Sequence, residues 1–232
     1  MEKYVVITGA SSGIGYDLAL QWVDLGFSVI CIARRGHLLK ELVENAPQKI
    51  YAIEFDLADF DNYPMLVERI GAIAQRIEVL INNAGVLINK PFEDFTPLEF
   101  DDIIAVNYKA PYFLIQRLIP FIQKSTLKSI INIGSIGGVD NTSKFPGLSI
   151  YSSSKGALST LTECLATEVY SKGCTINCLA LSAVKTEMLS NAFPGYIPDV
   201  TSRKMAKHIS GFVLNNSGII NGKVLQIGGI NI

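Results

Sequence analysis

A tyrosine and a lysine that could manage one proton together stand four positions apart, as Tyr151 and Lys155. In a helix, side chains at this spacing lie on the same face. An ammonium group beside a phenol favours the phenolate. At an effective dielectric constant of about 20 and a separation of ~5 Å, the attraction is about 3 kcal/mol, or roughly two pKa units. The pair therefore predicts a tyrosine whose pKa is lowered from about 10 towards neutral pH, as general acid–base catalysis requires. The same spacing also occurs on helices without a catalytic role.

A glycine-rich turn follows the first predicted strand, the β-branched run 5–8. The turn has glycines at positions 9, 13 and 15, and apolar residues at helical spacing follow it. Glycines let the backbone approach a pyrophosphate, and the N-terminus of the next helix supplies unpaired N–H groups and a positive dipole end. This strand, turn and helix predict a dinucleotide-binding site, although the spacing is not the better-known G-x-G-x-x-G.

Two arginines occupy the position that distinguishes NADP(H) from NAD(H) in sites of this type. The second predicted strand, 27–32, ends about 18 residues after the turn, where an NAD site of this type places a carboxylate against the ribose 2′-hydroxyl. Here the chain has Ala33, Arg34 and Arg35. Because two guanidinium groups can hold a phosphate through paired hydrogen bonds, the sequence favours NADP(H) over NAD(H). A solvated basic loop is the alternative interpretation.

Polar residues also end the third and fourth predicted strands, 50–55 and 78–81. Asp56, which precedes Leu57, could accept a hydrogen bond from an adenine amino group, or it could cap the helix that follows Phe60. The fourth strand is followed by the segment 82–85, Asn-Asn-Ala-Gly. Two amides and a glycine suit a strand end that braces its neighbours and lies flat beneath a cofactor.

Asn107 interrupts an apolar helical pattern that runs from about Pro97 to Gln123. In a regular helix, residue 111 would donate its N–H to the carbonyl group of Asn107, but Pro111 has no N–H. That carbonyl group is therefore expected to be free. It could hold a water molecule, or Asn107 and Pro111 could simply mark a bend.

The remaining pattern predicts the fold. Strands are expected at 128–133, 175–179 and 223–227, and a helix with an apolar stripe is expected from Tyr151 after a loop at 137–149. Strands that alternate with helices predict one α/β domain over residues 1–232. Its expected core is a Rossmann-type, doubly wound parallel sheet of about seven strands, with helices on both faces.

Composition and charge exclude several classes. The 232 residues are 49% hydrophobic, and 20 Lys and Arg balance 21 Asp and Glu without a like-charge run, so neither nucleic acid nor an anionic membrane is an expected partner. The longest apolar run, 110–122, is too short to span a bilayer. The chain is expected to be cytoplasmic. Its four cysteines form no CxxC pair and are expected to be reduced and packed.

A serine hydrolase and a metal enzyme are both disfavoured. Ser135 lacks the glycine two positions earlier that a nucleophile elbow requires, because Ile133 stands there. The only histidines, His37 and His208, lie in helical, partly polar settings that indicate surface positions. They support neither a Ser-His-Asp triad nor a histidine-based metal site, and no metal is predicted.

Together, the glycine turn 8–15, the segment 82–85, Asn107, Ser135 and the Tyr151/Lys155 pair resemble the classical short-chain dehydrogenase/reductase family. By this resemblance, Tyr151 is the general acid that protonates a carbonyl oxygen as hydride arrives, and Ser135 donates a hydrogen bond to the same oxygen. Lys155 holds the nicotinamide ribose and lowers the tyrosine pKa. Asn107 supports a water that links Lys155 to solvent.

The resemblance implies transfer of a hydride between NADP(H) and a small carbonyl or secondary alcohol substrate. A silent dinucleotide-binding sensor or scaffold is the alternative. The expected cofactor-binding residues are Thr8, Gly9, Ser11, Ser12, Gly13, Ile14, Gly15, Arg34, Arg35, Asp56, Leu57, Asn83, Ala84, Gly85, Tyr151, Lys155, Val184 and Thr186.

Two segments depart from the family pattern. Leu181-Ser182 replaces the usual Pro-Gly, although Ala183, Val184 and Thr186 match. The lid before Asp199 is short, and the residues expected to enclose the substrate are Phe145, Met188, Phe193 and Tyr196. A homodimer or homotetramer is expected, built on the apolar helix 110–122 and on the small-residue face at Gly156 and Ala157.

Overall fold

A computed structural model describes residues 2–228 and contains a seven-stranded sheet in which each strand pairs with its neighbours in parallel. Its order is β3-β2-β1-β4-β5-β6-β7. The strands are β1 (Tyr4–Thr8), β2 (Ser28–Ala33), β3 (Ile50–Glu54), β4 (Val79–Asn82), β5 (Ser129–Ser135), β6 (Thr175–Leu181) and β7 (Val224–Ile227). The sheet forms because continuous apolar runs can be buried on both faces.

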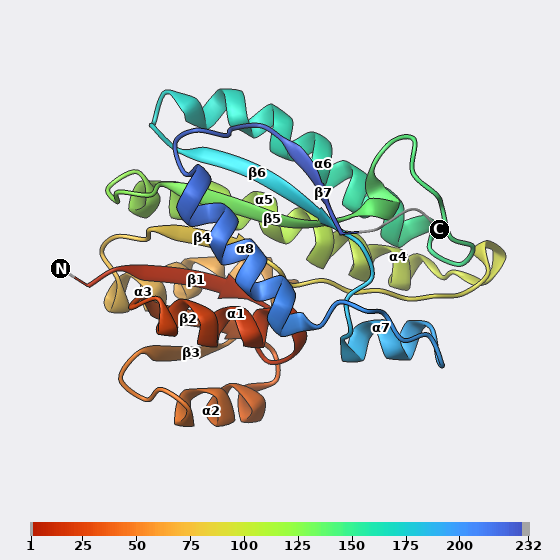
Figure 1. The fold of residues 1–232 in the computed structure, drawn as a ribbon, viewed down its shortest axis with the longest axis horizontal. Helices are drawn as coiled ribbons and strands as arrows, with labels where there is room; N and C mark the ends of the chain where they lie inside the picture. Colours follow the sequence, from red (N-terminus) through yellow and green to blue (C-terminus); the bar gives the residue numbers. More distant parts are fainter. Residues whose placement is uncertain (1, 229–232) are drawn as a thin grey trace.

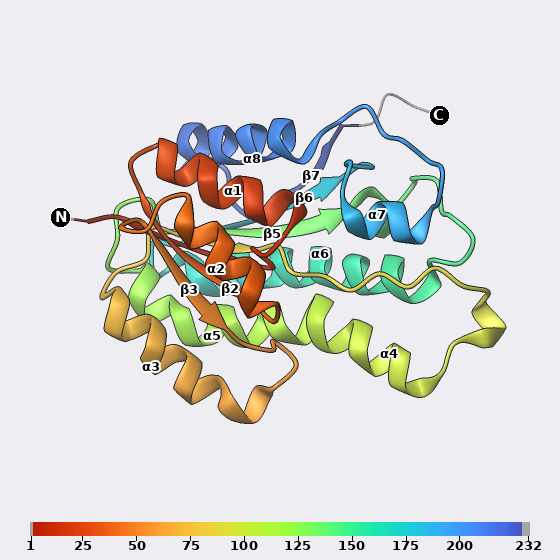
Figure 2. The same ribbon diagram turned by 90° about the horizontal axis from the view of Figure 1, so that it is seen from below.

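Helices cover both faces of the sheet, as Figure 2 shows edge-on. One face carries α1 (Gly13–Asp24), α2 (Gly36–Glu44) and α8 (Ser202–Asn216). The opposite face carries α3 (Tyr63–Ile73), α5 (Ala110–Ile122) and α6 (Ser149–Tyr170). Two shorter helices, α4 (Pro97–Ile104) and α7 (Glu187–Ala192), lie towards the end of the molecule where the strands terminate (Figure 1). The predicted doubly wound architecture is confirmed.

The two faces have separate apolar cores. Trp22 of α1 is fully buried in the first core and makes an edge-to-face contact with Phe27, with ring centroids 4.8 Å apart. The second core is built around Tyr63 of α3 and Leu118 of α5. Burying a side chain of this size contributes about 1.5–3 kcal/mol. The apolar stripes on the helices therefore determine which surface packs onto the sheet.

Several element bounds differ from the sequence prediction. β5 continues to Ser135 and β6 to Leu181 because these two residues pair with each other, and Leu181 also pairs with Ile227. The helix expected from Tyr151 begins at Ser149. The pattern from Pro97 to Gln123 is not one regular helix: a π-helical turn, η3 (Ala105–Lys109), separates α4 from α5. In that turn the Ala110 N–H donates to Ala105, five residues earlier.

The carboxyl ends of all seven strands lie at one edge of the sheet because the strands are parallel. The chain proceeds outward from β1 through β2 to β3, then returns to the other side of β1 with β4. This reversal between β1 and β4 creates a crevice at their carboxyl ends, where ligands bind in open α/β sheets. Every motif singled out in the sequence ends a strand at this edge or lies directly behind it.

Candidate active site

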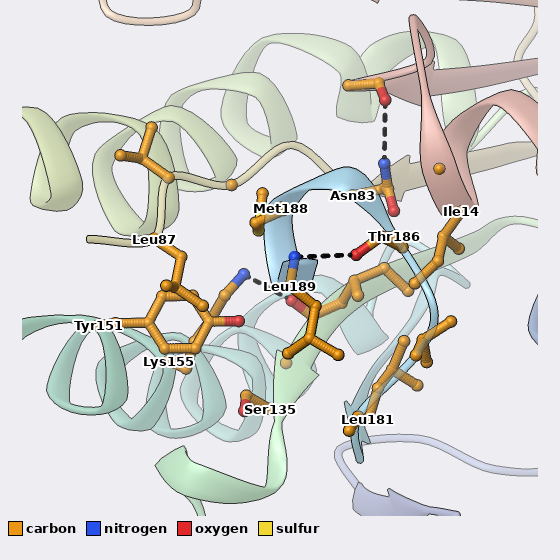
Figure 3. A pocket seen from close by; sticks show the side chains of 18 of the residues that line it. Ile14, Asn83, Leu87, Ser135, Tyr151, Lys155, Leu181, Thr186, Met188 and Leu189 are labelled. Carbon is orange, nitrogen blue, oxygen red and sulfur yellow. Dashed lines mark hydrogen bonds between the residues drawn. The ribbon is translucent and has the colours of Figure 1, made fainter. Parts of the chain in front are cut away.

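A cavity of ≈ 1170 Å³ opens at the carboxyl edge of the sheet. Figure 3 shows Tyr151, Lys155 and Ser135 together on one side of it and Ile14, Asn83 and Thr186 on the other. Met188 and Leu189 of α7 lie between the two groups in this view. The cavity is larger than the ~300–1,000 Å³ of a typical drug-sized pocket, so it has room for a dinucleotide and a second molecule.

The glycine turn forms the floor of one end of the cavity. Gly9 has φ +68°, a conformation that glycine adopts without strain. Gly15 faces inward, and a Cβ there would clash with the Gly9 carbonyl oxygen. Helix α1 starts at Gly13, and its N-cap residue Ser12 makes no side-chain capping bond. The free N–H groups of the first turn thus fit a diphosphate.

The segment after β4 braces this turn, as predicted. The Asn83 and Ala84 N–H groups both donate to Thr8 Oγ1 at 3.0 Å. The Asn83 side-chain amide donates to the carbonyl oxygens of Thr8 and Gly9, at 2.9 and 3.3 Å. Thr8 and Gly15 are buried and do not line the cavity; the other residues expected to bind the cofactor all do. Thr8 and Gly15 position the turn from behind.

The Arg35 side chain contacts the glycine turn. Its Nε donates to Ser11 Oγ at 3.2 Å, and its Nη2 donates to Ser12 Oγ. Its Nη1 lies 3.0 Å from Glu187 Oε2. Arg34 is more exposed, with Nη1 3.9 Å from Asp56 Oδ2. The two guanidinium groups therefore border the end of the cavity at which the sequence predicts a 2′-phosphate.

Asp56 does not cap the helix that follows Phe60, so that alternative is wrong. The N-cap residue is Asp59 for the short helix η1 (Phe60–Asn62) and Asn62 for helix α3 after it. Asp56 instead accepts a hydrogen bond from the Ala58 N–H at 3.0 Å, which closes a local turn. It lines the cavity beside Leu57, and its role towards an adenine remains a prediction.

Ser135 and Tyr151 come from different elements, the end of β5 and the start of α6. The Ser135 hydroxyl accepts a hydrogen bond from the Gly137 N–H at 3.3 Å. Lys155, one helical turn after Tyr151, is 4% exposed. Its Nζ donates to the Ile133 carbonyl oxygen at 2.8 Å and lies 5.9 Å from the centre of the Tyr151 ring. Packing of α6 on β5 thus brings the three side chains to one wall.

The pKa of Tyr151 departs from the sequence prediction. Burial raises it to about 12, an effect that Ser135 opposes only in part. Burial also lowers the pKa of Lys155 to about 8, opposed by the nearby Cys178. The prediction that the Lys155 charge lowers the pKa of Tyr151 towards neutral pH is therefore wrong, because burial disfavours the charged forms of both side chains, the phenolate and the ammonium. The Lys155 Nζ also donates a hydrogen bond to the Ile133 carbonyl oxygen.

Asn107 lies behind the cavity wall and is fully buried. Its Oδ1 accepts from the Val86 N–H at 2.7 Å, while its Nδ2 donates to the Val86 carbonyl oxygen at 2.9 Å and to Ser154 Oγ at 3.0 Å. Asn107 therefore joins the segment after β4 to helix α6, between Tyr151 and Lys155. Its expected water contact remains a prediction.

The segment after β6, which lacks the usual Pro-Gly, is held by backbone hydrogen bonds. The Ser182 N–H donates to Ile227 at 3.0 Å, and the Lys185 N–H donates to Val200 at 2.8 Å. Thr186 caps α7 by accepting from the Leu189 N–H at 3.3 Å. Val184 and Thr186 both line the cavity.

Several residues that line the cavity were not singled out in the sequence, among them Leu87 and Glu187. Leu87 follows the predicted segment 82–85 and lies over the Tyr151 side of the cavity. Glu187 begins α7 and contacts Arg35, 152 positions away. An acidic residue directly after Thr186 is typical of the first turn of a helix, which was the only signal for Glu187 in the sequence.

Two arguments for oligomer formation are weaker in the structure. The apolar residues of α5, including Leu114, Ile115 and Leu118, are buried within the chain itself. Gly156 faces Gly138 of the same chain, since a Cβ on Gly156 would lie 3.2 Å from the Gly138 carbonyl oxygen. A homo-oligomer would therefore have to use side chains that remain exposed.

Other expectations concern residues outside the cavity. His37 and His208 are both exposed, as predicted. Cys164 is exposed, whereas the remaining cysteines are buried, so the expectation of four packed thiols is wrong at that position. Within residues 2–228, no helix is long and apolar enough to cross a membrane. The same residues hold no cluster of three metal-ligating side chains.

Comparison with known protein families gives a match to short chain dehydrogenase over residues 3–196. The chain is 32% identical over 199 residues to the uncharacterized oxidoreductase YxjF of Bacillus subtilis (strain 168), covering 82% of this chain and 75% of the relative. It is 31% identical over 193 residues to 3-oxoacyl-(acyl-carrier-protein) reductase FabG of Staphylococcus aureus (strain Mu50 / ATCC 700699), covering 81% and 77%.

Solved structures share the fold over almost the whole chain. The 3-ketoacyl-(acyl-carrier-protein) reductase of Brucella melitensis, complexed with NADH, superposes with a TM-score of 0.87 at 24% identity, over 97% of this chain and 96% of that one. ElxO with NADP bound gives a TM-score of 0.84 at 27% identity, over 98% and 97%. Structural relatives therefore include proteins with either nicotinamide dinucleotide.

Proposed function

The chain belongs to the short-chain dehydrogenase family, and from this premise we propose that it is an NADP(H)-dependent oxidoreductase that interconverts a carbonyl compound and a secondary alcohol. One observation carries the proposal: Ser135, Tyr151 and Lys155 share a cavity with the glycine turn and Arg35. The turn and Arg35 would hold a dinucleotide, which would supply a hydride in the same cavity as a proton donor.

In reduction, bound NADPH supplies the hydride and the protein manages the proton. Tyr151 is a phenol at neutral pH, since burial raises its pKa to about 12, further above neutral than the ordinary value of about 10. The phenol can therefore donate a proton to the carbonyl oxygen as negative charge develops there. Ser135 accepts from the Gly137 N–H, which leaves its own O–H to donate to the same oxygen.

Lys155 orients the ribose side of the site. An ammonium group has three donors, and the Lys155 group uses one on the Ile133 carbonyl oxygen. The others can reach ribose hydroxyl groups or a water chain. Asn107 maintains this arrangement by fixing Val86 and Ser154 through its side-chain amide. We assign Asn107 a positioning role.

The test is a reductase assay with purified protein, NADPH and a panel of ketones and aldehydes. Loss of the nicotinamide absorbance only when a carbonyl compound is present supports the proposal. Binding of NADPH without oxidation across a broad panel would instead support a cofactor-binding sensor.

The substrate side of the cavity supports a neutral, mainly apolar carbonyl compound. Its lining includes Leu87, Phe145, Met188, Phe193 and Tyr196. Among the lining residues within 2–228, the cations are Arg34, Arg35 and Lys155. Arg35 is bonded to the glycine turn, and Lys155 Nζ is bonded to the Ile133 carbonyl oxygen. A substrate carboxylate placed there would lose hydration without gaining a charged partner, which is costly.

We expect a neutral aryl ketone to be reduced with a kcat/KM at least about tenfold above that of the same ketone carrying a carboxylate on its ring. Met188 is 39% exposed at the cavity, so a Met188→Arg variant can supply a cation without disturbing the core. The variant should reduce the difference in kcat/KM between the two ketones. A wild-type preference for the carboxylate compound contradicts the assignment.

We also propose a homodimer or homotetramer. Large apolar side chains remain exposed on α4 and α5, with Leu98 at 71%, Phe100 at 48% and Tyr112 at 38%. Covering them would remove apolar surface from water. Light scattering at micromolar protein should therefore give at least twice the chain mass of 25.3 kDa. A strictly monomeric species contradicts this expectation.

A further inference from the structure

Arg35 is shared between the glycine turn and helix α7. Its guanidinium group donates from Nε to Ser11, from Nη2 to Ser12 and from Nη1 to Glu187. All three of its nitrogens are therefore engaged. The Glu187 contact is an ion pair at 3.0 Å between side chains that are 40% and 59% exposed.

Glu187 is held in this place by the construction of α7. The helix begins at Glu187, directly after its capping residue Thr186. Thr186 in turn lies against the glycine turn, since a Cβ on Gly13 would be 3.2 Å from Thr186 Cγ2. At the other end of α7, the Asn89 side chain donates to the Ala192 carbonyl oxygen at 2.7 Å. The Glu187 carboxylate is thus delivered to Arg35 by a helix fixed at both ends.

A 2′-phosphate and the Glu187 carboxylate would require the same donors. A guanidinium group binds a phosphate best through two parallel N–H groups. One such pair in Arg35 is Nε with Nη2, and both of these face the serines. The other pair is Nη1 with Nη2, and its Nη1 faces Glu187. Two anions on one cation also repel each other. A dinucleotide without the 2′-phosphate leaves the ion pair undisturbed.

We propose that Glu187 is a specificity-determining residue that competes with the 2′-phosphate of NADPH for Arg35. This inference rests on the proposed function, since it assumes that Arg35 receives the phosphate. Glu187 then reduces the preference for NADPH over NADH that the arginines create. The contact also makes the phosphate site sensitive to the position of α7, which carries Met188 and Leu189 into the cavity.

The experiment measures the dissociation constants of NADPH and NADH by nicotinamide fluorescence. Glu187→Gln keeps the size of the side chain and removes its charge. It should tighten NADPH by about three- to fivefold at low ionic strength and leave NADH unchanged, because an exposed ion pair is modest in strength. Unchanged NADH binding also reports that the variant is folded.

Two further variants separate competition from general electrostatics. Asp199→Asn removes one negative charge from the same cavity lining and should not alter the NADPH to NADH ratio. In an Arg35→Met background, the gain from Glu187→Gln should largely disappear, because no guanidinium group remains to be released. A gain of equal size in that background overturns the proposal, as does an equal gain from Asp199→Asn.

The failure of this inference differs from the failure of the proposed function. If Arg35→Met weakens NADPH selectively while Glu187→Gln leaves the ratio unchanged, only the competition is overturned. If Arg35→Met affects NADPH and NADH equally, the assignment of the phosphate to Arg35 fails first, and the role of Glu187 fails with it.

Discussion

Replacing Tyr151 with Phe is expected to lower kcat for carbonyl reduction by about 10²- to 10⁴-fold, the range that a positioned general acid contributes. The substitution removes the phenolic oxygen and keeps the aromatic ring, so the packing of α6 against β5 should persist. NADPH should therefore bind nearly as well as to the wild type. Turnover by absorbance and NADPH binding by fluorescence give the two measurements on one protein sample.

Tyr196→Phe is the matched control for this prediction. Tyr196 also lines the cavity but is 44% exposed, and no proton transfer is assigned to it. Loss of the Tyr196 hydroxyl group should change KM more than kcat. A Tyr151→Phe variant that reduces a good substrate at the wild-type rate would show that another group is the acid.

The raised pKa of Tyr151 suits one direction of the reaction. Reduction consumes a proton, and burial keeps the phenol protonated at neutral pH, where its pKa of about 12 leaves almost no phenolate. Oxidation of an alcohol needs the phenolate instead and is therefore favoured as the pH rises. Burial lowers the pKa of Lys155 to about 8, so this group is mostly an ammonium at neutral pH and loses its charge as the pH rises above that value.

The fold follows from the sequence because its strands are continuous apolar runs that alternate with amphipathic helices. Such short runs are typical of strands buried on both faces, and the helices between them require parallel connections. The ends of β5 and β6 could not be located in the same way. Ser135 and Leu181 are strand residues because they pair with each other, 46 positions apart along the chain.

The π-helical turn at Asn107 shows a second limit. Pro111 signals a missing hydrogen bond, but a bend, a free carbonyl group and a widened turn all satisfy that signal. The structure has the widened turn, with the Asn107 side chain bonded to Val86. The Asn107 side chain is held by Val86, 21 positions away, and a local sequence pattern does not contain that partner.

The site was predictable where each residue ends a strand or begins a helix at the carboxyl edge. Ser135, Tyr151 and the glycine turn meet there for this reason. Charge effects were less predictable. The pKa of Tyr151 depends on burial, and the environment of Arg35 depends on Glu187, which a different connection brings to the same edge.

Replacing Arg34 and Arg35 with Ala is expected to weaken NADPH binding by about 10- to 100-fold or more while changing NADH binding little. A charge-assisted hydrogen bond to phosphate contributes about 1.5–3 kcal/mol, and each 1.4 kcal/mol is a factor of about ten in affinity. NADH lacks the phosphate and so loses no such bond. Dissociation constants of the two cofactors for the double variant measure the effect.

The single variants Arg34→Ala and Arg35→Ala then show how much each arginine contributes to NADPH binding. Arg35 approaches the glycine turn through Ser11 and Ser12, whereas Arg34 is 65% exposed and 3.9 Å from Asp56. The larger loss is therefore expected for Arg35→Ala. Lys40→Ala removes a cation of α2 that does not line the cavity, and it should leave both cofactors unaffected. Equal losses of NADPH and NADH in the double variant would mean that the arginines attract the diphosphate rather than the 2′-phosphate, and the preference for NADP(H) would then have to be abandoned.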